Sequence, residues 1–171
     1  MFETEEDLAD LQRLLDESFD KAVFREYSMF KERNRLSAGK LAGFSGVRLM
    51  GIATVNSKGE PRAAPRSAAF LHGKFWLAAN TNSVSARRLA LNPAIGVTYF
   101  ENHLLIMGHG TVSLLPEHGA GFKELRVEWE EAFRGGRDSA AGTDLFIRVD
   151  ATHLLAFANH PERYPAAWSK K

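Results

Sequence analysis

Short β-type segments joined by tight turns fill the middle of this chain, and they limit the folds that it can adopt. Val47 to Asn56 is apolar and rich in strand-forming residues, and the turn signal Asn56-Ser57-Lys58-Gly59 follows it. Pro61 to Leu71 is the predicted return strand, and Phe75 opens a third strand after the turn at His72-Gly73-Lys74. This succession favours an antiparallel barrel or sandwich over a doubly wound parallel sheet.

The second half of the chain continues the pattern. Strands are predicted for Ala94 to Glu101 and for Leu104 to Leu114, and a final pair for Asp144 to Val149 and His153 to Ala158. Within the second predicted strand, Pro65 indicates a bulge or an edge position, because proline cannot donate a hydrogen bond to a neighbouring strand. The count is about six or seven strands, with few helices between them.

Other segments have helical periodicity and predict peripheral helices. Residues 3 to about 34 carry apolar residues at three- and four-residue steps, and Thr4 is the expected N-cap. A short helix is expected from Ser37 to about Phe44, another after a cap at Ser83, and a longer one from Glu117 to Arg134. We expect a helical extension over residues 1–45 and a β-rich domain over residues 46–171.

Composition excludes several classes of protein. The 171 residues are 44% hydrophobic and 25% charged, which is ordinary for a globular domain. Cysteine is absent, so the chain has no disulfide, thiolate metal site or cysteine nucleophile. The formal charge of +1 favours neither a nucleic-acid nor an anionic membrane partner. The acidic N-terminus lacks the pattern of a signal peptide and no apolar run is long enough to cross a bilayer, so we expect a cytoplasmic protein.

Common catalytic and metal motifs are missing from the sequence. It contains no G-x-G-x-x-G or P-loop pattern, and Gly43-Phe44-Ser45-Gly46 is one residue short of a nucleophile elbow. The six histidines show neither H-x-x-x-H nor H-E-x-x-H spacing. We therefore predict no metal site and assign no catalytic residue.

Basic residues gather in one region. Between Lys58 and Arg88 there are six basic residues and one acid, and the polar loop Asn80 to Ser85 runs into a predicted helix N-terminus. Arginines, hydroxyls and the first amides of a helix are the groups that bind phosphate. The competing interpretation is a solvated basic face with an ordinary serine cap.

The order and spacing of short motifs from Leu49 to Val112 resemble a known family. The motifs are Gly51-Ile52-Ala53-Thr54-Val55 with its turn to Pro61, Lys74 to Asn80, Ser83 to Pro93, and an apolar strand through Ile106 to Gly110. Together they resemble the pyridoxamine 5′-phosphate oxidase-like, flavin-binding split β-barrels. The resemblance implies a mainly β (α+β) fold, an antiparallel split β-barrel with peripheral helices and an N-terminal helical extension. It also implies a homodimer that holds FMN in a groove at its interface, although some relatives use F420 and others bind haem.

The sequence departs from the oxidase that gives the family its name. That enzyme has basic residues on the second strand and an S-R-K triplet before the helix, whereas the matching positions here are Ala64, Ala69 and Ser83-Val84-Ser85. A glutamine that contacts the flavin there corresponds to Leu105. Pyridoxamine 5′-phosphate oxidase activity itself is therefore not expected.

Other cations are available to replace the missing ones. Arg62 and Arg66 lie on the same predicted strand, and Arg87 and Arg88 lie in the helix. The resemblance then implies a rearranged phosphate site, whereas the competing interpretation is a decayed site with solvent-facing arginines. The expected cofactor-binding residues are Ala64, Pro65, Arg66, Ser67, Ala78, Ala79, Asn80, Ser83, Ser85 and Arg88.

Two functions follow from the resemblance. The first is an oxidoreductase that uses FMN or F420 on a small-molecule substrate, and the second is a non-catalytic binder of flavin, haem or another planar ligand. Phe70, Trp76 and Tyr99 are either walls of the ring site or barrel core. His109 is either a proton donor facing the barrel or a structural residue, and a haem ligand would have to be a residue such as His109 or His153.

Overall fold

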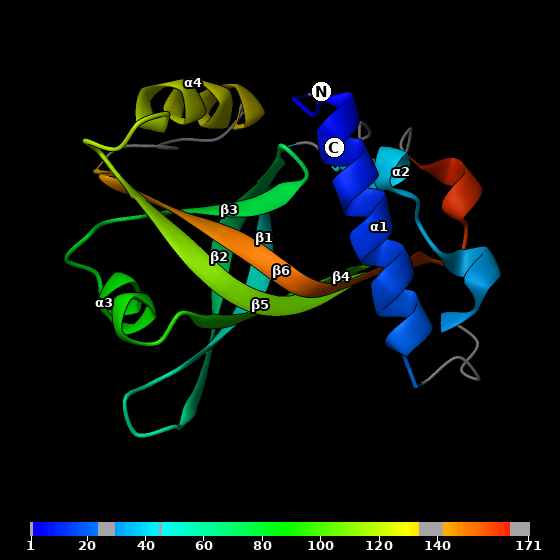
Figure 1. Cartoon of the computed structure of the whole chain (residues 1–171), viewed down its shortest axis with the longest axis horizontal. Coiled ribbons are helices and arrows are strands. Elements are labelled where there is room, and N and C mark those ends of the chain that lie inside the picture. Colours follow the sequence, from blue (N-terminus) through cyan, green and yellow to red (C-terminus); the bar gives the residue numbers. More distant parts are fainter. Residues whose placement is uncertain (1, 24–29, 45, 134–141, 165–171) are drawn as a thin grey trace.

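The computed structural model describes residues 2–23, 30–44, 46–133 and 142–164, and its centre is a closed antiparallel barrel (Figure 1). The strands run β1-β2-β3-β6-β5-β4 around the barrel. Their bounds are β1 Val47–Val55, β2 Pro61–Leu71, β3 Lys74–Ala79, β4 Ala94–Glu101, β5 Leu104–Pro116 and β6 Leu145–Ala158. The predicted antiparallel barrel with peripheral helices is confirmed.

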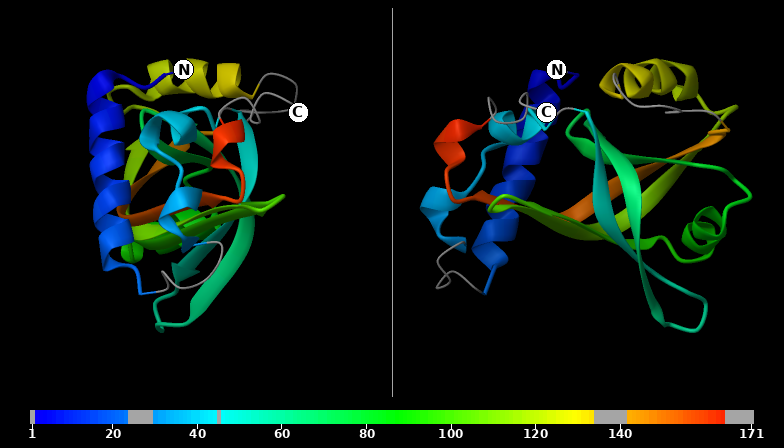
Figure 2. Two further views of the ribbon diagram at one scale, coloured as in Figure 1. Left: turned by 90° about the vertical axis from the view of Figure 1, so that its right-hand side faces the viewer. Right: turned by 180° about the vertical axis from the view of Figure 1, so that it is seen from behind.

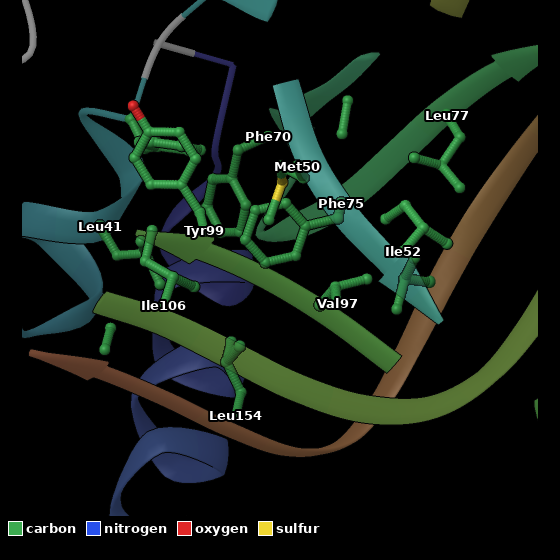
Figure 3. Packing of buried hydrophobic residues seen from close by; sticks show 14 of the residues in the cluster. Leu41, Met50, Ile52, Phe70, Phe75, Leu77, Val97, Tyr99, Ile106 and Leu154 are labelled. Atoms are coloured by element: carbon green, nitrogen blue, oxygen red, sulfur yellow. The ribbon is translucent and has the colours of Figure 1, made fainter. Parts of the chain in front are cut away.

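Alternating residues of these strands fill the barrel. Met50, Phe70 and Phe75 lie together in its interior (Figure 3), and the ring centroids of the two phenylalanines are 4.8 Å apart. Successive side chains of a strand point to opposite faces, so the same strands place every second residue outside. On β5, Leu104 and Ile106 are buried in this way.

The last β-segment is one strand, not the predicted pair. β6 runs unbroken through Asp150-Ala151-Thr152, and its register against β5 shifts where His109 faces His153 and Gly110 faces Ala151. Thr152 is therefore the extra residue of a β-bulge. The polar residues that suggested a break between two strands therefore lie at a bulge within one strand.

The first helix is shorter than predicted. Helix α1 spans Glu5–Lys21 and has the expected cap, since the Thr4 hydroxyl accepts from the Asp7 amide and the Asp7 carboxylate accepts from the Thr4 amide. It ends at Lys21, since Ala22 is extended and the side chain of Val23 is 91% exposed. The stretch after it is a short 3₁₀ turn, η2 Glu32–Asn34, while residues 24–29 lie outside the described part.

The other helices lie around the barrel (Figures 1 and 2). They are α2 Ala38–Ala42, α3 Val84–Leu91, α4 Phe122–Ala132 and the 3₁₀ turn η3 Pro161–Arg163. Helix α4 begins later than predicted, because the Glu117 amide bonds to the Asp144 carbonyl and a turn leads to Gly121 at φ 87°. Residue 134, the predicted helix end, is outside the described residues.

Pro65 lies on an edge and not in a bulge. β2 pairs with β1 from residue 61 to 69 without a register shift, whereas β3 pairs only with Ala68 to Leu71. Residues 61–67 thus have a strand on one side only, which is where proline is tolerated.

The N-terminal helices and the barrel share one core. Leu11 and Leu15 of α1 and Leu41 of α2 belong to the same buried cluster as Ile106 of the barrel. None of the helices in the described ranges is long and apolar enough to cross a membrane.

Candidate functional site

A cavity opens at the half of β2 that has only one neighbouring strand. In the register of β1 and β2, Met50 faces Arg66, Ile52 faces Ala64 and Thr54 faces Arg62. Directly paired residues share one face of a sheet. Arginines therefore stand on the same face as the apolar barrel lining, where they meet a cavity of about 180 Å³.

Helix α3 supplies the second wall of this cavity. Val84, Ser85 and Arg88 line it. The Ser83 hydroxyl accepts from the Ala86 amide at 3.2 Å and so caps the helix as predicted. The first turn of a helix has backbone N–H groups without an intrahelical acceptor and carries the positive end of the dipole.

Two of the three arginines that line the cavity, Arg66 and Arg88, give it an unbalanced positive charge. Arg62 is paired with Glu60 at 2.8 Å. Arg66 donates a hydrogen bond to the Ser85 hydroxyl, which joins β2 to α3 across the cavity. Within the described residues, neither Arg66 nor Arg88 has a carboxylate partner. The cavity thus suits an anion with several oxygens.

A smaller, mostly apolar cavity of about 20 Å³ adjoins the first. It shares Ile52, Thr54, Arg66 and Ser85 with the larger one. The other lining residues come from β3, α3 and β6, and they are Leu77, Ala78, Ala79, Leu89 and Ile147. Figure 3 shows Ile52 and Leu77 at this end of the barrel. An anion site and an apolar wall are therefore continuous.

The structure brings six of the ten expected cofactor-binding residues to these two cavities: Ala64, Arg66, Ala78, Ala79, Ser85 and Arg88. The other four do not line them. Pro65 and Ser67 alternate with Ala64 and Arg66, so they lie on the opposite face of β2. Ser83 acts as a helix cap, and Asn80 belongs to the loop described next.

The loop that leads into α3 is held by Asp144. This carboxylate accepts from the Thr81 amide at 2.6 Å and from the Thr81 hydroxyl at 2.8 Å. The Asn80 side-chain nitrogen Nδ2 also lies 3.4 Å from the Asp144 Oδ2 atom. A loop anchored at one carboxylate fixes where α3 begins and hence where Ser85 and Arg88 stand.

Sequence reasoning missed Thr54 and Ile52. Thr54 is 8% exposed, one of the few buried polar residues of the described chain. Strand alternation could have identified them, because Ile52 and Thr54 lie on the same face of β1 as Met50, and β1 pairs with the strand that carries the arginines. No sequence signal marked Asp144, because Asn80 and Thr81, the residues that bond to it, are over sixty positions away.

The aromatic candidates and His109 lie elsewhere. Phe70, Trp76 and Tyr99 are all buried, and none is among the described residues that line the two cavities. Burial and the hydrogen bond to Glu101 raise the pKa of Tyr99 to about 12. Of the two alternatives for His109, the proton donor facing the barrel is wrong, because His109 is exposed and stacks on His153 outside. No group of three metal-ligating side chains occurs in the ranges that the structure describes.

The outer face of β2, β1 and β4 carries no charged side chain over its central part. Paired outward residues are Leu49 with Ser67, Gly51 with Pro65 and Thr98, and Ala53 with Ala63 and Gly96. Leu49 and Phe100 are each 67% exposed. The centre of this face thus consists of small, uncharged residues, and exposed apolar side chains lie at one end of it.

Comparisons with known proteins agree with this fold. A conserved hypothetical protein from Mycobacterium tuberculosis (Rv2991) is 17% identical with a TM-score of 0.62, over 79% of this chain and 92% of that one. A protein named F420 reductase is 18% identical with a TM-score of 0.52, over 65% and 91%. A FAD-binding protein of Mesorhizobium loti is 14% identical with a TM-score of 0.52, over 64% and 82%.

These likenesses concern the fold alone, because the identities are low. A search of curated proteins finds no match. The sequence profile of pyridoxamine 5′-phosphate oxidase, however, matches residues 40–155, well over half of the chain and all of β1 to β5. The chain therefore belongs to the pyridoxamine 5′-phosphate oxidase family.

Proposed function

We propose that this protein is an oxidoreductase that binds FMN in the arginine-lined cavity and acts on a small molecule. The observation that carries the proposal is the pair of cations, Arg66 and Arg88, that face the cavity without a carboxylate partner in the described chain. Similarity to an F420 reductase and to a FAD-binding protein supports a cofactor of the flavin and deazaflavin class. F420 is the alternative cofactor.

The residues present fit such a group. Arg66, Arg88, the Ser85 hydroxyl and the first amides of α3 would hold the phosphate. Ile52, Leu77 and Ile147 would form an apolar wall for the ring. A bound flavin would supply hydride transfer, so the chain's own task is to bind and orient it. The two basic residues of β2 that the named oxidase uses are alanines here, and Arg66 would take over their role.

We also propose that the functional unit is a homodimer. Ligand sites for molecules of this size usually have about 300 Å³ or more, whereas the arginine-lined cavity has about 180 Å³ in one chain. A second copy seated on the uncharged face of β2, β1 and β4 would cover apolar surface, and by reaching around the unpaired edge of β2 at residues 61–67 it would close the cavity on the other face. The site would then include both chains.

Arg66→Ala tests the phosphate assignment. Loss of a charge-assisted contact of about 1.5–3 kcal/mol should weaken FMN binding roughly tenfold or more. Riboflavin, which lacks the phosphate, should bind the variant and the original protein alike. Flavin fluorescence quenching measures both affinities, and Arg87→Ala is the control because Arg87 is exposed next to Arg88 and is not among the residues that line the cavity. Equal FMN affinity of Arg66→Ala and the original protein would overturn the assignment.

A non-catalytic binder of a planar ligand is the second candidate. It is favoured by one observation: among the described residues that line the two cavities there is no histidine, acid, lysine or tyrosine to move a proton. Absorbance spectra and titrations with FMN, F420 and haem separate the candidates. A Soret band would favour a haem binder, and a bound flavin that no donor reduces would favour a non-catalytic one.

A further inference from the structure

Two histidines face each other on the outside of the barrel, away from the arginine-lined cavity. His109 of β5 and His153 of β6 are direct cross-strand partners next to the bulge. Their ring centroids are 5.0 Å apart, and the ring planes differ by 25°. The backbone of adjacent strands thus holds the two imidazoles side by side. Because the lone pairs of stacked rings lie in nearly parallel planes, both rings have to rotate out of the stack to face one ion.

Neither ring is engaged by the rest of the described chain. The Thr152 hydroxyl donates to the backbone carbonyl of His109, not to its ring. Neither imidazole has a hydrogen bond or a carboxylate partner within the part of the chain that the structure describes. An imidazole without such a partner can offer a ring nitrogen lone pair to a metal ion.

We propose that His109 and His153 form a two-histidine site for a divalent transition-metal ion. Neutral imidazole is a good ligand for Cu²⁺, Ni²⁺ and Zn²⁺, and it does not suit the hard ions Mg²⁺ and Ca²⁺. Solvent would supply the other ligands, because His109 is exposed. A metal bound there would connect β5 to β6 at the bulge. The proposal is independent of the flavin site, with which it shares no residue.

The surroundings limit how tightly the site can bind. Lys21, at the end of α1, is the charged side chain that acts on His153 besides His109. The positive charge of Lys21 repels a metal ion. The Glu17 carboxylate, whose Oε2 atom lies 3.8 Å from the Lys21 Nζ atom, offsets part of this repulsion. With two protein ligands the order of affinity should follow the general series for such ions, with Cu²⁺ above Ni²⁺ and Zn²⁺.

The test uses the whole chain without an affinity tag. Isothermal titration calorimetry with Cu²⁺ should show one binding site per chain. His109→Ala and His153→Ala should each lower the Cu²⁺ affinity about tenfold or more. His118→Ala is the matched control, since His118 is also exposed and lies in a turn away from the pair. Circular dichroism without metal checks that each variant keeps its fold.

The electron paramagnetic resonance spectrum of the Cu²⁺ complex gives a second readout. Coupling to two imidazole nitrogens is expected in the original protein, and to one in each single variant. Unchanged affinity in both variants, or a loss of affinity in His118→Ala equal to theirs, would overturn the proposal. So would a one-nitrogen spectrum of the original protein.

Discussion

At the scale of single residues, β5 and β6 pass so close that two positions of β5 have no room for a side chain. A Cβ atom on Gly110 would lie 2.2 Å from the Asp150 carbonyl oxygen and 2.8 Å from the Ala151 Cα atom. A Cβ atom on Gly108 would lie 2.8 Å from the His153 carbonyl oxygen. These contacts are with backbone, which cannot turn aside, so glycine is a steric requirement of the bulge.

Gly110→Ala should therefore destabilise the protein. Overpacking a close contact lowers the free energy of unfolding by about 1–3 kcal/mol. Gly39→Ala is the control, because a Cβ atom there meets nothing within 4 Å and Gly39 lies in helix α2. That substitution should raise the free energy of unfolding by about 0.4–1 kcal/mol. Equilibrium denaturation in urea measures both, and equal effects of the two substitutions would contradict the steric argument.

Individual site residues could be predicted only where a local pattern marks them. Arg66 stands on a strand with few acids nearby and was identified from the sequence, whereas Ser83 was identified correctly only as the helix cap and does not line the cavities. His109 and His153 are 44 positions apart (153 − 109), and their contact depends on a register that a bulge resets. No local pattern reports such a register.

At the scale of elements, strands bounded by turns were predicted closely and helix ends were not. The β1–β2 and β2–β3 turns contain Gly59 and Gly73 at positive φ, and these residues mark the turns in the sequence. The end of α1 has no such marker, because Lys21 and Ala22 both suit a helix and yet Ala22 is extended. β6 was divided in two because polarity was read as a break where the structure has a bulge.

The loop before α3 offers a test at the same scale. Asp144→Ala removes the acceptor of the Thr81 amide and hydroxyl, so residues 80–83 should open more often. Hydrogen exchange of the Thr81 amide should become faster by about tenfold, as expected for the loss of roughly 1.4 kcal/mol of a charge-assisted bond. FMN affinity should fall with it, since the loop places α3.

Asp10→Ala is the control for this experiment, because the partner of Asp10 among the described residues is Arg13 on the exposed surface of α1. It should leave both the exchange of the Thr81 amide and FMN affinity unchanged. If the Thr81 amide exchanges at the same rate in Asp144→Ala as in the original protein, Asp144 does not anchor the loop.

At the scale of the whole molecule, the open cavity and the uncharged face belong to the same strands. Arg62, Ala64 and Arg66 stand on one face of β2, and Ala63, Pro65 and Ser67 on the other. All six are exposed, which is unusual for both faces of a strand that forms part of a barrel. A second chain that covers the outer face and reaches around the unpaired edge of β2 would bury residues on both faces.

Leu49→Asp tests this arrangement. Leu49 is 67% exposed in one chain, and a second copy on the face would bury it, so a carboxylate there would have to lose its water. In sedimentation equilibrium at micromolar concentration the original protein should be a dimer and Leu49→Asp largely a monomer. Val127→Asp, on α4 with 66% exposure, should remain a dimer. FMN affinity should fall in Leu49→Asp alone, because its monomer would leave the cavity open. A dimeric Leu49→Asp would show that this face is not the dimer interface, and a monomeric original protein that binds FMN would show that one chain builds the site by itself.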